Sequence, residues 1–209
     1  FKKYPSKITE IDRKIYTEIT IIWKTDELKR SKPSPLDEAK WGLAVIEDSL
    51  WDTIPKVYKR LNDIFRKNLK KDLPRGFNPI QFGSWMGGDR DGNPNVTSEV
   101  TKKVILFSRW QAAKLYEKEF TKLIQDLSMK ECSTQIQKVT GKTFEPYRVY
   151  LRPIRDKIRL THQSIENHLT KNVPLINNKL LQDKNEILQP LRIVRDSLNL
   201  NRSQLIANS

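Results

Sequence analysis

Cysteine, glycine and long apolar runs are all scarce in this sequence of 209 residues. The single cysteine, Cys132, excludes a disulfide within the chain and is typical of a protein from a reducing compartment. No apolar run approaches the roughly 20 residues that span a bilayer. The first residues, FKKYPSKITE, also lack the apolar centre of a secretion signal. These absences predict a soluble, cytoplasmic protein that does not enter a membrane.

Positive charge is in excess, since 39 Lys and Arg residues against 25 Asp and Glu residues give a net charge of +14. Such an excess suggests a polyanionic partner. However, acidic residues alternate with basic ones in nearly every predicted helix, as in DRKIYTEI and YEKEFTKLIQD, and no basic stripe carries exposed aromatic residues for stacking on bases. Nucleic-acid binding is therefore the weaker interpretation. A basic helical module that binds nucleic acid or protein, without catalysis, is kept as the alternative function.

Apolar residues recur at three- and four-residue steps along most of the chain, which predicts helices with one buried stripe each. We expect an all-α array, treated as one helical segment over 1–209. Its proline residues are expected to start or bend helices. The predicted helices run from 8 to about 29, from 35 to the KKDLPRGFNP loop with an interruption or kink at Pro55, from 97 to 127, from 146 to about 169, and from 185 to 198 with Pro190 bending it or setting its start.

The glycines are concentrated in one place, because four of the seven lie in the stretch FGSWMGGDRDGNPNVT, residues 82–97. Glycine is retained where the backbone needs a positive φ or a close approach, so the cluster predicts a built loop. The short apolar stretch Ile80–Phe82 before it predicts one strand. A lone strand leaves its backbone hydrogen bonds unpaired, so we expect its partner strands to lie outside this chain.

Two known loop chemistries do not fit the cluster. Gly83 and Gly88 have the spacing of a phosphate-binding loop, but Asp89 and Arg90 stand where that loop needs lysine and serine or threonine. A calcium-binding loop that starts at Asp89 has Pro94 where its glycine must be. Two interpretations stay open on the residues alone: the charges hold the shape of the loop, or the loop faces a ligand.

The stretch GSWMGGDRDGNPNVT resembles a signature segment of phosphoenolpyruvate carboxylase, the family that joins bicarbonate to phosphoenolpyruvate to give oxaloacetate and phosphate. The segments WKTDELKRSKPSPLDEAKWGLAVIEDSLW, LFSRWQAAKLY, DLSM and EPYRVYLRPIRDKI resemble the same family. The resemblance implies a fragment from the N-terminal half of a cytoplasmic, tetrameric, allosteric enzyme. Such an enzyme fixes carbon, supplies the tricarboxylic acid cycle and uses Mg²⁺ or Mn²⁺.

The family fold is a barrel of parallel strands among many helices, so the resemblance makes Ile80–Phe82 a barrel strand and 83–95 an active-site loop. It assigns Trp85 to the substrate pocket, since the tryptophan of the G-S-W-M-G-G segment lines that pocket in the family. Arg90 is the second candidate there, as a group that balances anionic substrates. The residues expected to shape the loop are Gly83, Gly87, Gly88, Asp89, Asp91, Gly92 and Asn93.

Several functional parts of the family have no counterpart in this sequence. They are the T-A-H-P-T segment with its catalytic histidine, the G-R-G-G loop, the catalytic lysine, the phosphate-binding arginines and the metal-binding carboxylates. We therefore expect no catalytic residue and no bound metal in this segment, and an isolated chain without activity. In some family members cations near Arg30 help to bind a phosphorylated activator, which makes Arg30 a candidate effector site. His162, His168 and Cys132 are expected to have no chemical role.

Overall fold

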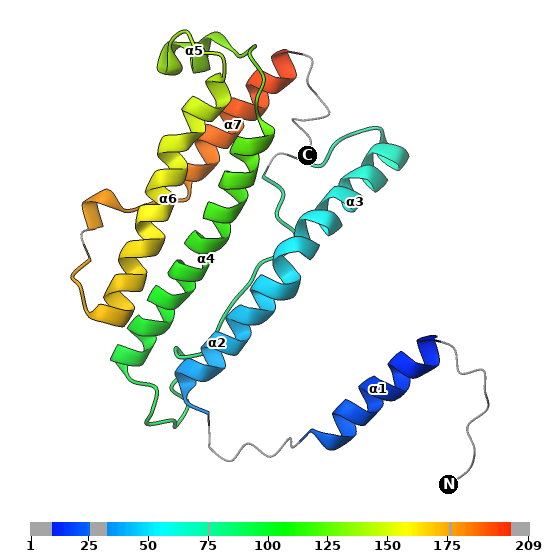
Figure 1. Ribbon diagram of the computed structural model, residues 1–209, viewed down its shortest axis with the longest axis vertical. Coiled ribbons are helices and arrows are strands. Elements are labelled where there is room, and N and C mark those ends of the chain that lie inside the picture. Colours follow the sequence, from blue (N-terminus) through cyan, green and yellow to red (C-terminus); the bar gives the residue numbers. More distant parts are fainter. Residues whose placement is uncertain (1–9, 26–32, 75, 176, 202–209) are drawn as a thin grey trace. The chain divides into compact units, whose positions relative to one another are not determined.

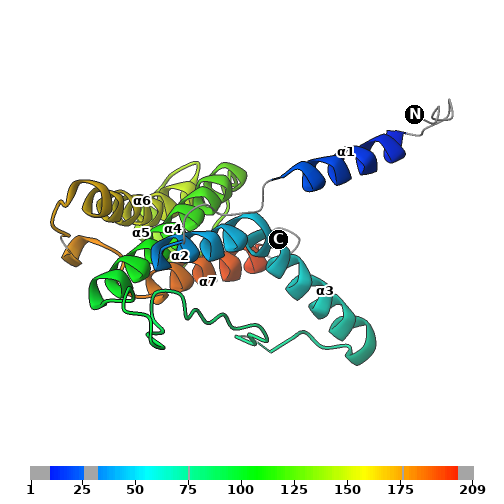
Figure 2. The same cartoon turned by 90° about the horizontal axis from the view of Figure 1, so that it is seen from below.

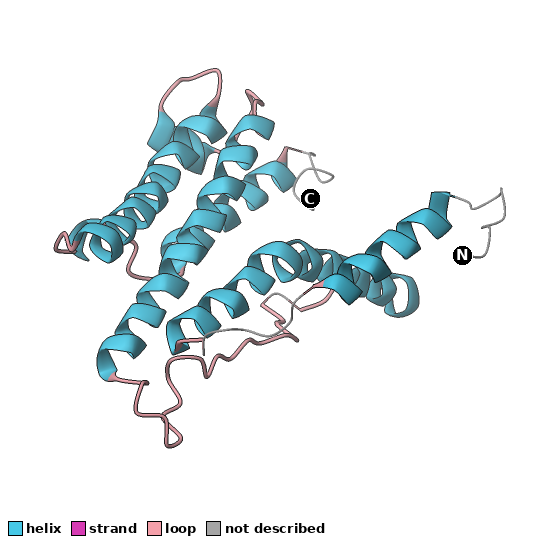
Figure 3. Ribbon diagram, turned by 60° about the horizontal axis from the view of Figure 1, so that its bottom comes forward, coloured by secondary structure: helices cyan, strands magenta, loops and turns pink. Residues whose placement is uncertain are grey.

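The computed structural model describes residues 10–25, 33–74, 76–175 and 177–201 (Figure 1). The chain divides into two compact units, Phe1–Ser34 and Pro35–Ser209. The described residues form seven α-helices, one π-helical turn and one 3-10 turn, and they contain no strand (Figure 3). The predicted all-α fold is confirmed for this part of the chain.

The first unit contains one described helix, α1, which spans Glu10–Lys24. The helix is confirmed within these bounds, but it ends before Thr25, which is described and not helical, so the predicted continuation to about 29 is wrong at this point. The predicted start at 8 lies outside the described residues. None of its residues is buried, and the predicted stripe of Ile11, Ile15 and Ile19 is exposed. Among the described residues of this unit, no second element offers a surface on which the helix could bury an apolar face.

The second unit is built on α4 (Ser98–Asp126) and α6 (Pro146–Lys171), which make the most extensive contact between helices and run antiparallel (Figure 1). The short helix α5 (Thr134–Thr140) and α7 (Asn185–Leu200) pack against α6. Burial of apolar side chains between these helices is the main force that holds them together. The core cluster consists of Ala113, Phe120, Ile124, Leu127, Ile136, Tyr147, Leu151, Ile158, Val194 and Leu198.

Side chains fix both ends of α4. The hydroxyl of Thr97 accepts the N–H of Val100 at 3.3 Å, so Thr97 is the N-cap of this helix. At the other end, the Arg148 guanidinium donates to the carbonyls of Ile124 and Gln125, each at 2.8 Å. Carbonyls in the last turn of a helix lack partners within the helix, so a cation from α6 satisfies them.

A second helical column consists of α2 (Pro35–Val45), the π-helical turn η1 (Ile46–Leu50) and α3 (Trp51–Leu69), which follow one another along one line in Figure 1. The predicted start at Pro35 is confirmed. The predicted interruption at Pro55 is wrong, since α3 continues through this residue, and the kink given as its alternative stays a prediction. The wider π-helical turn directly precedes α3, and there the N–H of Trp51 donates to the carbonyl of Ile46.

The strand predicted at Ile80–Phe82 is absent among the described residues, which are irregular at this point. A strand needs a neighbouring strand for its N–H and C=O groups, and no described residue supplies one. Figure 2 shows the long connection between α3 and α4 running back to the start of α4. The expectation that partner strands lie outside this chain stays a prediction.

Helix α5 was not predicted, although its ends carry recognisable signals. The Ser133 side chain accepts the N–H of Ile136, and Gly141 with φ of +70° follows its last residue. Seven residues are too few for a clear apolar period, which explains why the pattern missed this helix.

One buried hydrogen-bond network connects α5, α6 and α7. The Tyr147 hydroxyl lies 2.8 Å from the Ser197 hydroxyl, and the backbone N–H of Ser133 donates to Ser197 Oγ at 2.7 Å. Tyr147 and Ser197 are fully buried. Because a buried polar group without a partner is costly, this network fixes the mutual position of the three elements.

Ser197→Ala is expected to lower the free energy of unfolding by about 2 kcal/mol, because the buried Tyr147 hydroxyl and the partly buried Ser133 N–H both lose their hydrogen-bond partner. Tyr147→Phe removes one partner only, and we expect about half of that loss. Tyr150→Phe is the matched control, since the Tyr150 hydroxyl has no hydrogen-bond partner among the described residues and should be nearly silent. Urea unfolding of the three variants measures the difference. A Ser197→Ala protein as stable as the control would contradict the role given to this network.

Candidate functional site

The glycine-rich loop rests on α4 through Gly87. This residue is buried and has φ of +69°, a region that side-chain-bearing residues avoid. A Cβ built on it would lie 2.5 Å from Val104 Cγ2, so the backbone of the loop touches the helix. The Thr101 hydroxyl of α4 also donates to the Gly87 carbonyl at 2.6 Å. The first turns of α4 therefore follow the loop in the sequence and also hold it in place through contacts with Gly87.

A tight turn follows the tryptophan of the loop. The N–H groups of Gly88 and Asp89 both donate to the Trp85 carbonyl, at 2.9 Å each. Further along, the Asp89 carboxylate accepts the N–H of Asp91 at 3.3 Å, and the Asn93 side chain accepts the N–H of Asn95 at 3.0 Å. Two polar side chains of the loop thus hold its own backbone.

The other glycines of the loop differ in what they require. Gly92 has φ of +73°, which favours glycine. A Cβ at Gly88 would meet the Trp85 carbonyl oxygen at 3.6 Å, which is an ordinary van der Waals contact, and Gly88 has no positive φ. Gly83 has no positive φ and only open space around it, so the structure supplies no conformational reason for glycine there.

Met86 joins the loop to α2. Its thioether lies over Gly42, where a Cβ would come within 2.7 Å of the sulfur. Met86 is half-buried, whereas its neighbour Trp85 is 73% exposed. The loop is therefore attached to two helices, through Met86 to α2 and through Gly87 to α4, and the exposed Trp85 directly precedes these attachments.

Arg90 and the acidic residues Asp89 and Asp91 are exposed. Neither the Arg90 guanidinium nor the Trp85 indole makes a hydrogen bond, ion pair or ring contact with another described residue. The structure thus places both predicted pocket residues on one loop with free side chains, and it does not bring them into contact with each other.

Contacts from the π-helical turn η1 and from the first residue of α3 hold this helical column against α4. The Glu47 carboxylate accepts hydrogen bonds from the buried amide of Gln111 and from Lys114 Nζ, the latter at 3.2 Å. The bond from Gln111 is the main cause that lowers the pKa of Glu47, and Lys114 adds to it. Trp51 and Tyr116 make an edge-to-face contact with ring centroids 5.1 Å apart. These contacts set the spacing of the two helices on which the loop is attached.

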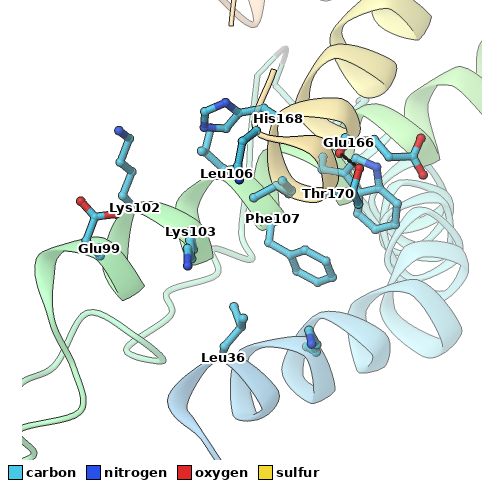
Figure 4. A pocket seen from close by; sticks show the side chains of 13 residues that line it. Leu36, Glu99, Lys102, Lys103, Leu106, Phe107, Glu166, His168 and Thr170 are labelled. Atoms are coloured by element: carbon cyan, nitrogen blue, oxygen red, sulfur yellow. Dashed lines mark hydrogen bonds between the residues drawn. The ribbon is translucent and has the colours of Figure 1, made fainter. Parts of the chain in front are cut away.

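A pocket of about 640 Å³ lies between the start of α2, the first half of α4 and the end of α6. Figure 4 shows Leu36 from α2 and Phe107 and Lys103 from α4 facing the same space. Trp85 and Arg90 do not line it. The lining residues come from three separate stretches of sequence, so no local motif marks the pocket.

The two histidines lie apart and have different partners. His162 Nδ1 is 3.2 Å from the Glu117 carboxylate, whose other oxygen accepts from Arg159 Nε at 2.6 Å. His168 Nδ1 is 2.9 Å from the Val173 carbonyl. The described ranges contain no group of three or more His, Cys, Asp or Glu residues that could hold a metal ion. The expectation that His162 and His168 have no chemical role stays a prediction.

Two further expectations concern the effector residue and the membrane. Arg30, the candidate effector residue, lies outside them. No helix in the described part of the chain is long and apolar enough to cross a membrane.

Comparison with known proteins identifies the family. A family profile described as phosphoenolpyruvate carboxylase matches residues 2–209. The phosphoenolpyruvate carboxylase of Pseudomonas paraeruginosa is 39% identical over 195 residues, which are 93% of this chain and 22% of that protein. The enzymes of that name from Acinetobacter baumannii (41% over 192 residues, 91% and 21%) and Alcanivorax borkumensis (43% over 180 residues, 86% and 20%) are similar in the same way.

The chain belongs to the phosphoenolpyruvate carboxylase family. It spans about one fifth of the length of the curated relatives that it matches. These relatives give no support to the alternative of a nucleic-acid-binding module.

Gly87→Ala should loosen the loop, because it combines a left-handed backbone with a methyl group placed against Val104. We expect the free energy of unfolding to fall by about 1–3 kcal/mol. Gly83→Ala is the matched control, because the added methyl meets open space. Thermal and urea unfolding of both variants measure the effect. Equal stability of the two would rule out the close contact between the loop and α4.

The Cys132 thiol should react slowly with iodoacetamide in the folded chain. It is half-buried, and burial raises its pKa, although a backbone hydrogen bond with Gln137 opposes part of this rise. A higher pKa means less thiolate, which is the reacting form, at any pH below it. Because Cys132 is the only cysteine, mass spectrometry at pH 8 reports on it alone. The urea-unfolded chain is the control, and equal rates in the two states would contradict this environment.

Proposed function

We propose that this chain is a segment of a phosphoenolpyruvate carboxylase and that its loop 83–95 forms part of the active site. One observation carries the proposal: the family match extends over residues 2–209 and includes a loop that is attached to two helices yet leaves Trp85 exposed. A structural loop would be expected to bury its largest apolar side chain, so an outward indole favours a wall that faces other parts of a larger protein.

The reaction explains why such a wall is useful. Bicarbonate takes the phosphoryl group of phosphoenolpyruvate, which leaves carboxyphosphate and the enolate of pyruvate. A bond between the enolate carbon and the carboxyl carbon then gives oxaloacetate, and inorganic phosphate leaves. Water hydrolyses the first intermediate and protonates the second. The Trp85 indole would exclude water from this space.

Arg90 would contribute charge on the same loop. Phosphoenolpyruvate and bicarbonate are both anions, and their combination concentrates negative charge that a guanidinium stabilises. Its side chain is exposed and forms no ion pair with a described residue, so it is available for such a role.

The remaining machinery would come from outside this segment. The described residues offer no group suited to Mg²⁺ or Mn²⁺, so we assign no metal-dependent step to them. The catalytic histidine and lysine, the phosphate-binding arginines and the metal ligands would belong to the rest of a cytoplasmic, tetrameric, allosterically regulated enzyme that supplies the tricarboxylic acid cycle.

The isolated chain should form no oxaloacetate from phosphoenolpyruvate and bicarbonate with Mg²⁺ present, measured by coupling to malate dehydrogenase. A chimera should be active if it carries this chain in place of the matching 192-residue segment of the Acinetobacter baumannii carboxylase. In that chimera Trp85→Ala should lower kcat at least tenfold, since one tenfold step corresponds to about 1.4 kcal/mol of lost transition-state stabilisation.

Trp23→Phe is the control for this chimera, because Trp23 is 88% exposed on α1, far in sequence from the loop. Its activity should match that of the unaltered chimera. Activity of the isolated chain, or a folded tetrameric chimera without activity, would contradict the proposal. Equal activity of the Trp85→Ala and Trp23→Phe chimeras would contradict the role of Trp85 alone.

A further inference from the structure

Helix α2 contains one glycine, Gly42, in its interior. Glycine weakens a helix relative to alanine because it has more backbone freedom to lose on folding. Gly42 has no positive φ that would require it. A local reason for glycine is therefore missing, and the explanation must come from what lies against this residue.

Met86 lies against it, 44 residues later in the chain. The end of the Met86 side chain occupies the space that a Cβ at Gly42 would need, with the sulfur 2.7 Å from that position. Methionine is flexible enough to fill an irregular space of this kind. Gly42 thus opens a seat on α2, and the thioether of Met86 fills it.

Hydrogen bonds hold the backbone on both sides of Met86. Trp85 precedes Met86, and the Trp85 carbonyl accepts two N–H groups from Gly88 and Asp89. On the other side, the Gly87 carbonyl accepts the Thr101 hydroxyl. Met86 lies within this turn, directly after Trp85, so loss of its side chain from Gly42 would remove one of the two attachments of the turn that carries the Trp85 indole.

We propose that Gly42 and Met86 are positioning residues for Trp85, so that α2 acts on the carboxylation reaction through this seat. The inference rests on the proposed function, because it requires Trp85 to face the substrates. It adds a residue from a helix that carries no predicted site residue. Neither Gly42 nor Met86 needs to touch a substrate, since both act through the direction of the neighbouring indole.

The seat itself is tested in the 209-residue chain by amide hydrogen exchange at Gly88 and Asp89, whose N–H groups close the turn. Gly42→Ala and Met86→Ala should each speed exchange at both amides about tenfold, equivalent to about 1.4 kcal/mol of lost protection. The double variant should exchange no faster than either single variant, because Gly42→Ala displaces the Met86 thioether from α2 and Met86→Ala removes it, so both changes break the same contact. Gly83→Ala, whose added methyl meets open space, is the control.

Gly42→Ala also separates positioning from plain stability. Alanine favours the helix, so a residue with only a structural role would give an equal or higher Tm and unchanged exchange at Gly88 and Asp89. The seat predicts faster exchange at these amides although the Tm does not fall. Unchanged exchange, or effects of the two single variants that add in the double variant, would overturn the seat.

The link to catalysis is tested in the Acinetobacter baumannii chimera. Gly42→Ala and Met86→Ala should lower kcat several-fold with a smaller change in KM, and Met86→Leu should recover most of the activity by refilling the seat. Normal kcat in variants with fast exchange would overturn the positioning role. If the unaltered chimera is inactive, the proposed function fails and the positioning role fails with it, while the exchange results still decide whether the seat exists.

Discussion

The packing of α4 against α6 is the contact on which the second unit depends. Apolar burial between them supplies the core, and polar groups along the seam fix their register, as Arg148 of α6 does when it caps the last carbonyls of α4. Other segments attach to this pair. The Leu181 backbone, for example, receives the Arg109 guanidinium of α4 on its carbonyl and gives its N–H to the Thr161 hydroxyl of α6. The pair is thus a rigid frame to which the rest of the unit is added.

Contacts with this helix pair and with α2 fix the position of the glycine-rich loop. Its Gly87 contacts the first turns of α4, and its Met86 contacts α2, which continues into the π-helical turn η1 that Glu47 and Gln111 hold to α4. A loop with one attachment would pivot about it, whereas two attachments on different helices also fix its direction. The Trp85 side chain is exposed, but the backbone next to it is held on two helices.

Much of this architecture could be predicted because its causes are local. A helical apolar period and the prolines that start helices, Pro35 and Pro146, depend on neighbours within a few residues, and both signals were predicted from the sequence. The seat of Met86 on Gly42 joins residues 44 positions apart, and nothing near either residue marks the other. The pocket among α2, α4 and α6 was not predicted either, because its lining residues are also far apart in the sequence. The strand at Ile80–Phe82 failed differently, because a strand depends on partners that the described residues do not provide.

Exposed apolar surface in the second unit follows from the same dependence on partners. Helix α3 is amphipathic, yet none of its residues is buried, and Phe82 and Trp85 after it are 59% and 73% exposed. Burying such side chains stabilises a protein by about 1.5–3 kcal/mol each, so a complete enzyme would not leave a row of them in water. A chain that spans about one fifth of its relatives has too little mass to cover them. Under the proposed function, the remaining four fifths of a carboxylase would pack on this exposed apolar surface of α3. The loop with Trp85 follows α3 in the sequence.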